Sequence, residues 1–446
     1  MLKKNDVINL KIEDLTNLGF GVGRHNGAVV FVADAVVGEV DEVKIILAKG
    51  SYYIGKLVRI ITPSDMRCGG RCNISGCKSC AYKNISYSDE LVFKKKIIEG
   101  AFIHEGLTKV AINDVIPSPV SNNYRNKAQY PISKDKNGEY VIGFFAPKSH
   151  RVCEASKCPL APTVFSDIID ELKVYFKKNE ISVYDEESGK GLLRHVYLRR
   201  AEIGGEILLT LVINGTSLPD ETGLATTIKS KFPDVVGLLI NSNKKNTNVI
   251  LGDEYRTIFG RDYIYDTLAG VRLKITAPSF YQVNRSAAEV LYGKARELAA
   301  LDGGEVLLDL YCGAGSIGLS MAEDTSELIG IEIVESAVEC AKENAKSNGI
   351  SHAKFYTGDA SATEKLLSRA EAELKRKILP DVIILDPPRA GCNAELIKFV
   401  SKLSPKRVVY ISCNPTTLAR DCKLFTEYGY TTNEVFGAIP YNAQAH

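Results

Sequence analysis

The sequence has 446 residues, of which 45% are hydrophobic and 25% are charged. That composition is typical of a globular protein, and the length exceeds a single ordinary core, so we expect two or three domains. The net charge of +2 excludes a globally basic surface, so any nucleic-acid binding must come from local patches.

The N-terminus predicts neither a secretory signal nor a membrane anchor, because no continuous apolar run follows residues 1–6. We therefore expect a cytoplasmic protein without membrane contact. In a reducing compartment, the eleven cysteines point to a metal or an iron–sulfur cluster before disulfides.

The first sixty residues alternate between apolar and polar side chains, as short strands do, and glycines separate the runs. The expected strands are residues 7–12, 29–32, 41–47 and 53–58. This pattern predicts a small all-β barrel over residues 1–62. Residues 19–24 (Gly-Phe-Gly-Val-Gly-Arg), 30–32 (Val-Phe-Val) and 37–39 (Val-Gly-Glu) resemble a TRAM domain, the RNA-binding barrel of tRNA- and rRNA-modifying enzymes. The alternative is a barrel that serves only for packing.

Four cysteines lie in a glycine-rich stretch just after this barrel. They are Cys68, Cys72, Cys77 and Cys80. Close thiolates on a loop can reach one centre, as zinc and iron–sulfur sites require, and Cys158, which precedes a proline, is a candidate for a distant ligand. The spacing indicates a metal centre and leaves zinc and iron–sulfur open.

Residues 63–265 are expected to form an α+β middle domain. Ser88, followed by acids and then lysines, predicts the start of an amphipathic helix. In residues 124–130 (Tyr-Arg-Asn-Lys-Ala-Gln-Tyr), Arg125 and Lys127 lie among aromatic side chains. Cations bind phosphates and aromatic rings stack on unpaired bases, so this stretch favours an RNA-facing edge. The alternative is an ordinary strand edge of mixed polarity.

From residue 266 to residue 446, strands and helices alternate, which predicts a doubly wound parallel sheet. An apolar strand leads into Gly313, Gly315 and Gly318, the spacing of a nucleotide-binding turn, and the next strand ends at Glu332, where an acid grips ribose hydroxyls. No Walker-type lysine follows the last glycine, so the ligand is a dinucleotide or S-adenosylmethionine (SAM).

Two short apolar strands, residues 382–385 and 408–411, end at polar turns that contain Asp386 and Cys413. Ligands bind beyond the carboxyl ends of parallel strands, so we expect both turns to converge on one crevice. Cys413 is then a candidate nucleophile, because a thiolate is the usual covalent catalyst for a soft electrophile such as an activated ring carbon. The alternative is a buried structural cysteine.

Five motifs in the same order resemble the RNA uracil-5 methyltransferases, specifically the branch that modifies 23S ribosomal RNA. They are Ser-Phe-Tyr-Gln-Val-Asn at 279–284, Asp-Leu-Tyr-Cys-Gly-Ala-Gly at 309–315, Gly-Ile-Glu at 330–332, Asp-Pro-Pro-Arg at 386–389 and Ser-Cys-Asn-Pro at 412–415. The resemblance implies an α/β chain with a C-terminal Rossmann-like methyltransferase domain, SAM as the methyl donor, a [4Fe–4S] cluster, and 23S rRNA as the substrate. We expect a monomer.

By this resemblance Gln282, Tyr311, Glu332 and Asp386 line the SAM pocket, and Cys413 adds to C6 of the uracil ring so that C5 can take the methyl group. The implied cluster ligands are Cys72, Cys77, Cys80 and Cys158, with Cys68 as an alternative to Cys72 and Cys153 as a weaker substitute for Cys158.

The C-terminal tail departs from the family pattern, in which a glutamate is the expected base for the C5 proton. Here Asn442 and Gln444 replace the family's Thr and His, and His446 falls in register with the glutamate. An imidazole can act as a general base, so His446 is a candidate, and a truncated sequence or a divergent branch is the other explanation.

Three other functions stay open: an RNA-binding iron–sulfur protein without activity, a tRNA methyltransferase, and a small-molecule methyltransferase. The predicted barrel and the basic pair Arg125 and Lys127 argue against the last.

Overall fold

The computed structural model describes residues 2–439 apart from residues 71, 73, 148, 155 and 156. The chain divides into two compact units, one of residues 1–118 with the tail from residue 433, and the other of residues 119–432. Within the described ranges, no helix is long and apolar enough to cross a membrane.

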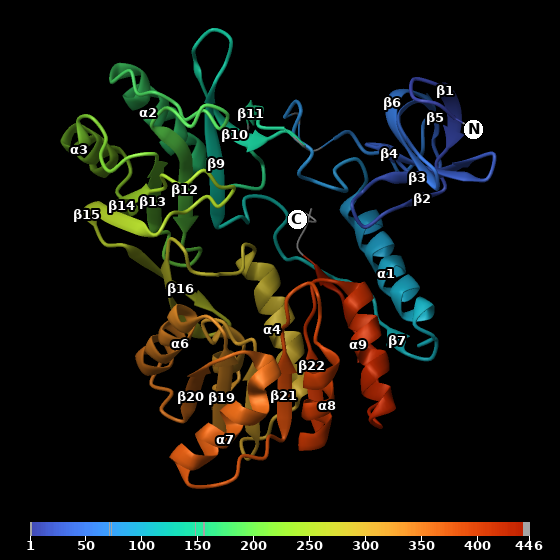
Figure 1. Ribbon diagram of the computed structural model, residues 1–446, viewed down its shortest axis with the longest axis vertical. Helices are drawn as coiled ribbons and strands as arrows, with labels where there is room; N and C mark the ends of the chain where they lie inside the picture. Colours follow the sequence, from blue (N-terminus) through green and yellow to red (C-terminus); the bar gives the residue numbers. More distant parts are fainter. Residues whose placement is uncertain (1, 71, 73, 148, 155–156, 440–446) are drawn as a thin grey trace. The chain divides into compact units, whose positions relative to one another are not determined.

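The first unit contains a six-stranded sheet in the order β1-β5-β6-β4-β3-β2 (Figure 1). Its strands are β1 (Val7–Lys11), β2 (Asp14–Leu15), β3 (Gly21–His25), β4 (Ala28–Ala33), β5 (Val40–Lys49) and β6 (Tyr52–Thr62). Alternate residues such as Val30, Val32 and Val43 form its core. A Cβ on Gly23 would lie 2.4 Å from the Lys11 carbonyl oxygen, so the sheet curls until β3 lies against the end of β1. The predicted N-terminal β-domain is confirmed.

After the cysteine-rich stretch, the first unit continues with helix α1 (Tyr87–His104), whose buried side chains include Phe93 and Phe102. The helix begins earlier than Ser88 predicts, because Ser86 is the N-cap and its side chain accepts a hydrogen bond from the Asp89 amide (3.1 Å). Two short parallel pairs tie the tail to this unit. They are β7 (Ala111–Ile112) with β23 (Glu434–Val435) and β8 (Ile116–Pro117) with β24 (Ala438–Ile439).

The second unit begins with a seven-stranded sheet in the order β11-β10-β9-β12-β13-β14-β15. Its strands are β9 (Lys127–Lys134), β10 (Tyr140–Phe145), β11 (Val152–Glu154), β12 (Leu193–Arg200), β13 (Ile207–Ile213), β14 (Val235–Ser242) and β15 (Glu254–Gly260). All seven residues of β13 are buried, as expected for a central strand covered on both faces. Its helices are α2 (Thr163–Lys178) and α3 (Glu221–Lys231). The α+β middle part of the prediction is confirmed.

A hairpin, β16 (Tyr263–Leu268) and β17 (Val271–Thr276), precedes a five-stranded parallel sheet in the order β20-β19-β18-β21-β22. The strands are β18 (Val306–Leu310), β19 (Glu327–Glu332), β20 (Ala353–Thr357), β21 (Val382–Leu385) and β22 (Arg407–Tyr410). The chain order reverses at β18, which has β19 on one side and β21 on the other. In open sheets of this kind the ligand crevice lies at that reversal.

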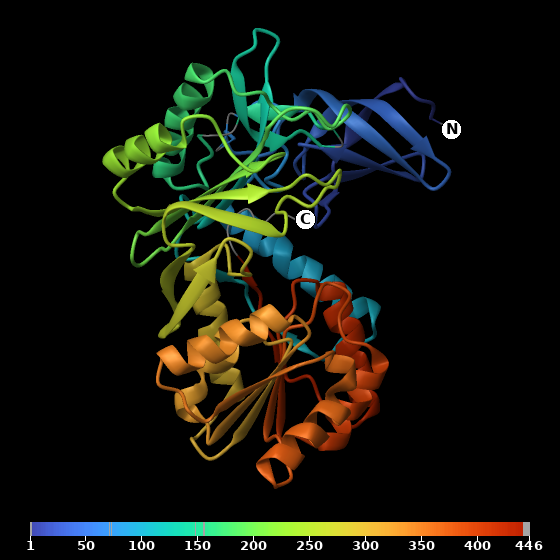
Figure 2. The ribbon, with the colours of Figure 1, turned by 60° about the vertical axis from the view of Figure 1, so that its left-hand side comes forward.

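Helices cover both faces of the parallel sheet (Figure 2). They are α4 (Arg285–Ala299), α5 (Ser316–Ser320), α6 (Glu335–Ser347), α7 (Thr363–Leu374), α8 (Ala394–Leu403) and α9 (Pro415–Glu427), with 3-10 turns at Ala322–Asp324 and Ala360–Ala362. Successive residues of a strand pack on opposite faces of the sheet. Leu307 packs with α4 and α6, whereas Leu308 packs with α7, α8 and α9. The predicted doubly wound domain is confirmed.

Candidate functional site

The turn after β18 is built from glycines whose conformations suit a bound ligand. Gly313 and Gly315 have positive φ angles of +54° and +79°. A Cβ on Gly315 would lie 3.1 Å from Leu319 and from the Phe355 ring, so no side chain fits there without displacing the core. The amide of Gly318 donates to Asp309 Oδ2 (3.0 Å), which fixes the turn to the strand beneath it.

Glu332, at the end of β19, lies next to this turn. Its Oε2 accepts from the Gly313 amide (3.1 Å) and its Oε1 from the Val334 amide (2.9 Å). The carboxylate is only half-buried, so it retains accepting capacity toward a ligand hydroxyl.

Tyr311 starts the same turn in a left-handed conformation, with φ of +65°. A residue other than glycine in that region stores strain, which the surrounding structure must hold in place. Burial, with a further contribution from the neighbouring Cys392 thiol, raises the pKa of Tyr311, so the phenol stays neutral.

Gln282 lies on the loop between β17 and α4. Side chains in and next to the seven-stranded sheet, called the central sheet below, donate hydrogen bonds to the backbone of that loop. The Asn126 side-chain amide donates to the Gln282 carbonyl (2.7 Å), and Arg199 donates to the Ala277 carbonyl (3.0 Å). The Tyr292 hydroxyl, on α4, is hydrogen-bonded to Ser316 Oγ at 2.8 Å.

The sequence did not predict the contact of Tyr292 with Ser316, at the start of α5. An aromatic residue on the buried face of a helix has the pattern of a core residue, so no sequence signal separates Tyr292 from one.

Asp386 follows β21, and burial raises its pKa to about 6. Burial also raises the pKa of Asp309 to about 7, with further contributions from Asp386 and Glu332, while the Gly318 amide lowers it. Among the described residues, Asp309 Oδ1 is buried without a hydrogen-bond partner. The carboxyl groups of Asp309, Glu332 and Asp386 thus interact electrostatically beside the glycine turn, which favours a cation there.

Cys413 is exposed on the turn between β22 and α9. Asn414 caps the helix by accepting from the Thr416 amide (3.1 Å), and Ser412 Oγ accepts from the Asn414 amide (3.0 Å). Leu385 pairs with Tyr410 across the parallel strands, so the Asp386 loop and the Cys413 turn leave the sheet side by side. An exposed thiol is therefore presented at the sheet edge that carries the glycine turn.

The four clustered cysteines are half-exposed, and Cys68 Sγ approaches the Lys83 carbonyl at 4.0 Å. Cys72, Cys77 and Cys80 belong to the first unit; Cys158, half-exposed, and Cys153, buried, belong to the second. In the part of the chain that the structure describes, no three His, Cys, Asp or Glu side chains gather as a metal site requires.

The aromatic part of the RNA-edge prediction is wrong. Tyr124 and Tyr130 are 6% and 0% exposed, so their rings belong to the interior and cannot stack on a base. Arg125 and Lys127 remain half-buried. The pKa of Lys127 falls to about 8, mainly because it is buried and further because Arg199 and Arg125 are close.

The C-terminal base motif lies beyond the structural description. Strand β24 ends at Ile439, and Asn442, Gln444 and His446 lie outside the described residues.

Comparisons with known proteins agree with this geometry. A family model described as tRNA (Uracil-5-)-methyltransferase matches residues 86–442, and a TRAM domain model matches residues 2–58. Uncharacterized RNA methyltransferases of Clostridium tetani and Bacillus cereus (strain ATCC 10987) are each 38% identical to this chain, over 97% of it and 93% of their own length. The crystal structure of Pyrococcus abyssi tRNA (uracil-54, C5)-methyltransferase in complex with S-adenosyl-L-homocysteine is similar with a TM-score of 0.74 and 26% identity, covering 93% of this chain and 92% of that one.

Proposed function

The chain belongs to the tRNA (uracil-5-)-methyltransferase family, SAM-dependent enzymes that methylate C5 of uridine in RNA, and on that premise we propose that Cys413 is the nucleophile and 23S rRNA the substrate. The observation that supports the role of Cys413 is its exposed position on the turn beside the Asp386 loop.

Uracil chemistry explains why a thiolate is needed. C5 of uracil is too weakly nucleophilic to be alkylated directly, so Cys413 Sγ forms a bond to C6 and the electron pair of the C5–C6 double bond moves into an enolate with carbanion character at C5. SAM, when bound, supplies the methyl group that C5 takes up. A base then removes the C5 proton, the double bond re-forms, and the bond from Cys413 to C6 breaks. The uracil ring must be unstacked from its neighbours in the RNA for the thiolate to reach its face.

We assign the cofactor pocket to Gln282, Tyr311, Glu332 and Asp386. The Glu332 carboxylate is suited to ribose hydroxyls because it lies beside the glycine turn. Asp386 follows the strand next to that of Cys413, so its carboxylate can act on both the cofactor and the target base.

For the proton-abstracting base we keep His446, on sequence register alone. Without a working base the reaction stops at the covalent stage. Denaturing gels of protein incubated with SAM and rRNA would then show a protein–RNA adduct; free methylated RNA without an adduct excludes the stalled reaction.

The TRAM domain supports rRNA as the substrate, because the 23S rRNA branch that the sequence resembles carries this domain. A tRNA substrate is the second candidate, since the similar Pyrococcus abyssi protein is a tRNA (uracil-54, C5)-methyltransferase by name. The half-buried cations Arg125 and Lys127 are proposed to contact RNA phosphates, without the aromatic stacking that the sequence suggested.

The test is a deletion strain whose rRNA and tRNA are digested separately and mapped for 5-methyluridine by mass spectrometry. We expect loss from 23S rRNA, restored by the parent gene and not by the Cys413→Ser gene. Loss confined to tRNA selects the second candidate. Full restoration by Cys413→Ser removes the proposed mechanism whichever RNA is affected.

We further propose that Cys72, Cys77, Cys80 and Cys158 bind a [4Fe–4S] cluster, with zinc as the competing metal. The spacing supports this proposal. Protein purified without oxygen should contain iron and acid-labile sulfide in equal amounts, and Cys72→Ser should lose both while Cys68→Ser keeps them. Stoichiometric zinc without sulfide would identify the competing metal.

A further inference from the structure

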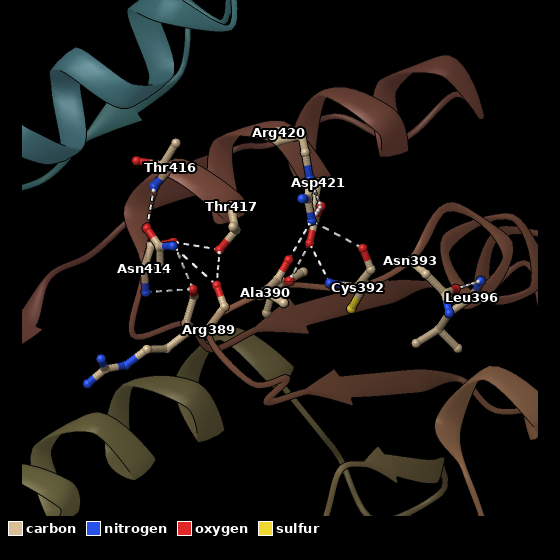
Figure 3. Close-up of polar contacts among 12 residues, drawn as sticks. Arg389, Ala390, Cys392, Asn393, Leu396, Asn414, Thr416, Thr417, Arg420 and Asp421 are labelled. Atoms are coloured by element: carbon tan, nitrogen blue, oxygen red, sulfur yellow. Dashed lines mark hydrogen bonds and ion pairs between the residues drawn. The ribbon is translucent and has the colours of Figure 1, made fainter. Parts of the chain in front are cut away.

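One face of helix α9 holds the loop that follows β21. Asn414 Nδ2 and Thr417 Oγ1 both donate to the backbone carbonyl of Arg389, each at 3.2 Å. Asn414 is also the helix N-cap, so the residue next to Cys413 is fixed both to its own helix and to the neighbouring loop. Figure 3 shows these contacts from the helix to the loop.

The second turn of the helix continues the same contact. Arg420 Nη2 donates to the carbonyls of Ala390 (2.9 Å) and Cys392 (3.2 Å). Asp421, in contrast, is an acceptor: its Oδ2 accepts a hydrogen bond from the Cys392 amide at 2.7 Å. The guanidinium and the carboxylate therefore bind both hydrogen-bonding groups of the Cys392 backbone (Figure 3).

Asp421 is completely buried, yet its carboxylate is well satisfied. Besides the Cys392 amide it accepts from the Tyr410 hydroxyl (2.6 Å) and from Arg420 Nε (2.8 Å). A buried carboxylate is stable only with such donors. Removing the carboxylate would leave its buried donors unpaired, and removing a donor would leave the carboxylate less well satisfied. Asp421 thus joins the last residue of β22, the body of α9 and the loop after β21.

Gly391 shows how closely the loop is held. It has φ of +76°, and a Cβ there would lie 2.5 Å from Asp421 Oδ2 and 2.6 Å from Arg420 Nη2. The loop backbone therefore lies directly against the ion pair, and a side chain at position 391 would collide with it.

The network also extends toward the cofactor turn. The thiol of Cys392 lies close enough to the hydroxyls of Tyr410 and Tyr311 for both to lower its pKa, but burial outweighs them and raises that pKa to about 11, so the thiol stays protonated. The loop that Asp421 holds is thus connected to the residue that starts the glycine turn.

We infer that Asp421 is a positioning residue for the methyl transfer: through Cys392, Tyr410 and Arg420 it sets the Asp386 loop and the Cys413 turn in register with each other. The inference rests on the proposed role of Cys413. Asp421 touches neither cofactor nor base; it fixes the distance between the two loops that do. A misplacement of about 1 Å can cost about 100-fold in rate, so this register matters for the chemistry.

The experiment separates positioning from folding by measuring two quantities on one protein. The first is SAM affinity by calorimetry without RNA. The second is the rate at which Cys413 forms an adduct with RNA containing 5-fluorouridine in place of uridine. This assay contains SAM, because the adduct becomes permanent only after the methyl group has been transferred to C5. C5 then carries fluorine and methyl and no proton; fluorine cannot leave as a cation, elimination is blocked, and the Sγ–C6 bond persists on a denaturing gel.

For Asp421→Asn, which keeps one acceptor oxygen, we expect adduct formation to slow by about tenfold or more while the SAM affinity stays within about twofold of the parent. Tyr410→Phe removes one donor from the same carboxylate and serves if the first variant fails to fold; we expect the same split. Thr417→Val should slow the adduct modestly, whereas Thr416→Val, exposed on the same turn, should match the parent.

Adduct formation at the parent rate in both Asp421→Asn and Tyr410→Phe overturns the inference, and so does an equal loss of SAM affinity and adduct rate in both. Failure of the proposed function is a different result, namely adduct formation by Cys413→Ser.

Discussion

At the scale of single residues, ionisation of Asp386 should determine how the rate of methylation falls at acidic pH, that is, the acidic limb of the pH–rate profile. Burial raises its pKa to about 6, so the carboxylate is ionised mainly above that pH. We expect kcat/KM to rise with pH through about 6 and then level off. Asp386→Asn should lose this limb and be slower at pH 8 by about 10- to 100-fold, the cost of one charged hydrogen-bond partner. Single-turnover methylation between pH 5 and 8 measures both; a limb that persists in the variant assigns it to another group.

Asp41, inside the TRAM domain, should make that domain less stable as pH rises. Among the described residues both of its carboxyl oxygens are buried without hydrogen-bond partners, and burial, with help from Glu39, raises its pKa from 3.8 to about 7. The folded state holds the proton more tightly than the unfolded state, so stability is highest below about pH 4 and falls as pH approaches 7.

Asp41→Asn removes this titration. We expect the variant to match the parent near pH 4 and to be more stable near pH 8. Hydrogen exchange of the β4 and β5 peptides in the full chain reports on this domain alone. A stability difference that does not change with pH would contradict the assignment.

At the scale of elements, the turn between β18 and α5 depends on a conformation that only glycine adopts without strain. For Gly315→Ala we expect a cost of about 1–2 kcal/mol from the left-handed conformation alone, since φ there is +79°. The added methyl would also press on Phe355, so SAM affinity should fall together with stability.

Gly293→Ala is the matched control, because Gly293 is exposed inside α4 and a Cβ there meets nothing within 4 Å. It should stabilise the protein by about 0.5–1 kcal/mol and leave SAM binding unchanged. Thermal unfolding and calorimetry measure both variants. If both alanines behave alike, the turn does not depend on its backbone conformation.

Across the whole molecule, the sequence predicted the elements better than the contacts between them. Apolar runs such as residues 382–385 identify strands because a parallel sheet is buried on both faces, and the glycine spacing identifies the cofactor turn. The alternation around Tyr124 and Tyr130 was assigned to the wrong face, because a pattern of period two does not say which side is inside.

The network around Asp421 could not be predicted at all. Cys392 and Tyr410 lie 29 and 11 residues from Asp421 in the chain, and a buried aspartate on an amphipathic helix has the same sequence pattern as an exposed one. The helix start was missed by two residues because Ser86 and Ser88 are equally good caps by type, and only the chain path selects between them.

The central sheet of the second unit supports the cofactor loop through Arg199, which is 2% exposed. Its guanidinium donates to the carbonyls of Ala277 and Ser279, and the Tyr197 hydroxyl also donates to Ala277 (2.7 Å). Arg199→Met keeps much of the volume, but it removes the donor to the Ser279 carbonyl and one of the two donors to the Ala277 carbonyl. An unpaired carbonyl costs about 1–3 kcal/mol. The loop that carries Gln282 should then shift, and SAM affinity should fall by about tenfold, equivalent to about 1.4 kcal/mol.

Two variants separate loop support from a general effect of charge. Tyr197→Phe removes one of the donors to Ala277, so its loss of SAM affinity should be smaller than that of Arg199→Met. Arg200→Met removes a neighbouring cation whose side chain leaves the opposite face of β12, and it should bind SAM as the parent does. Calorimetry without RNA ranks the three. An equal loss in Arg199→Met and Arg200→Met would mean that positive charge, and not the hydrogen bonds to the loop, is what the central sheet contributes to cofactor binding.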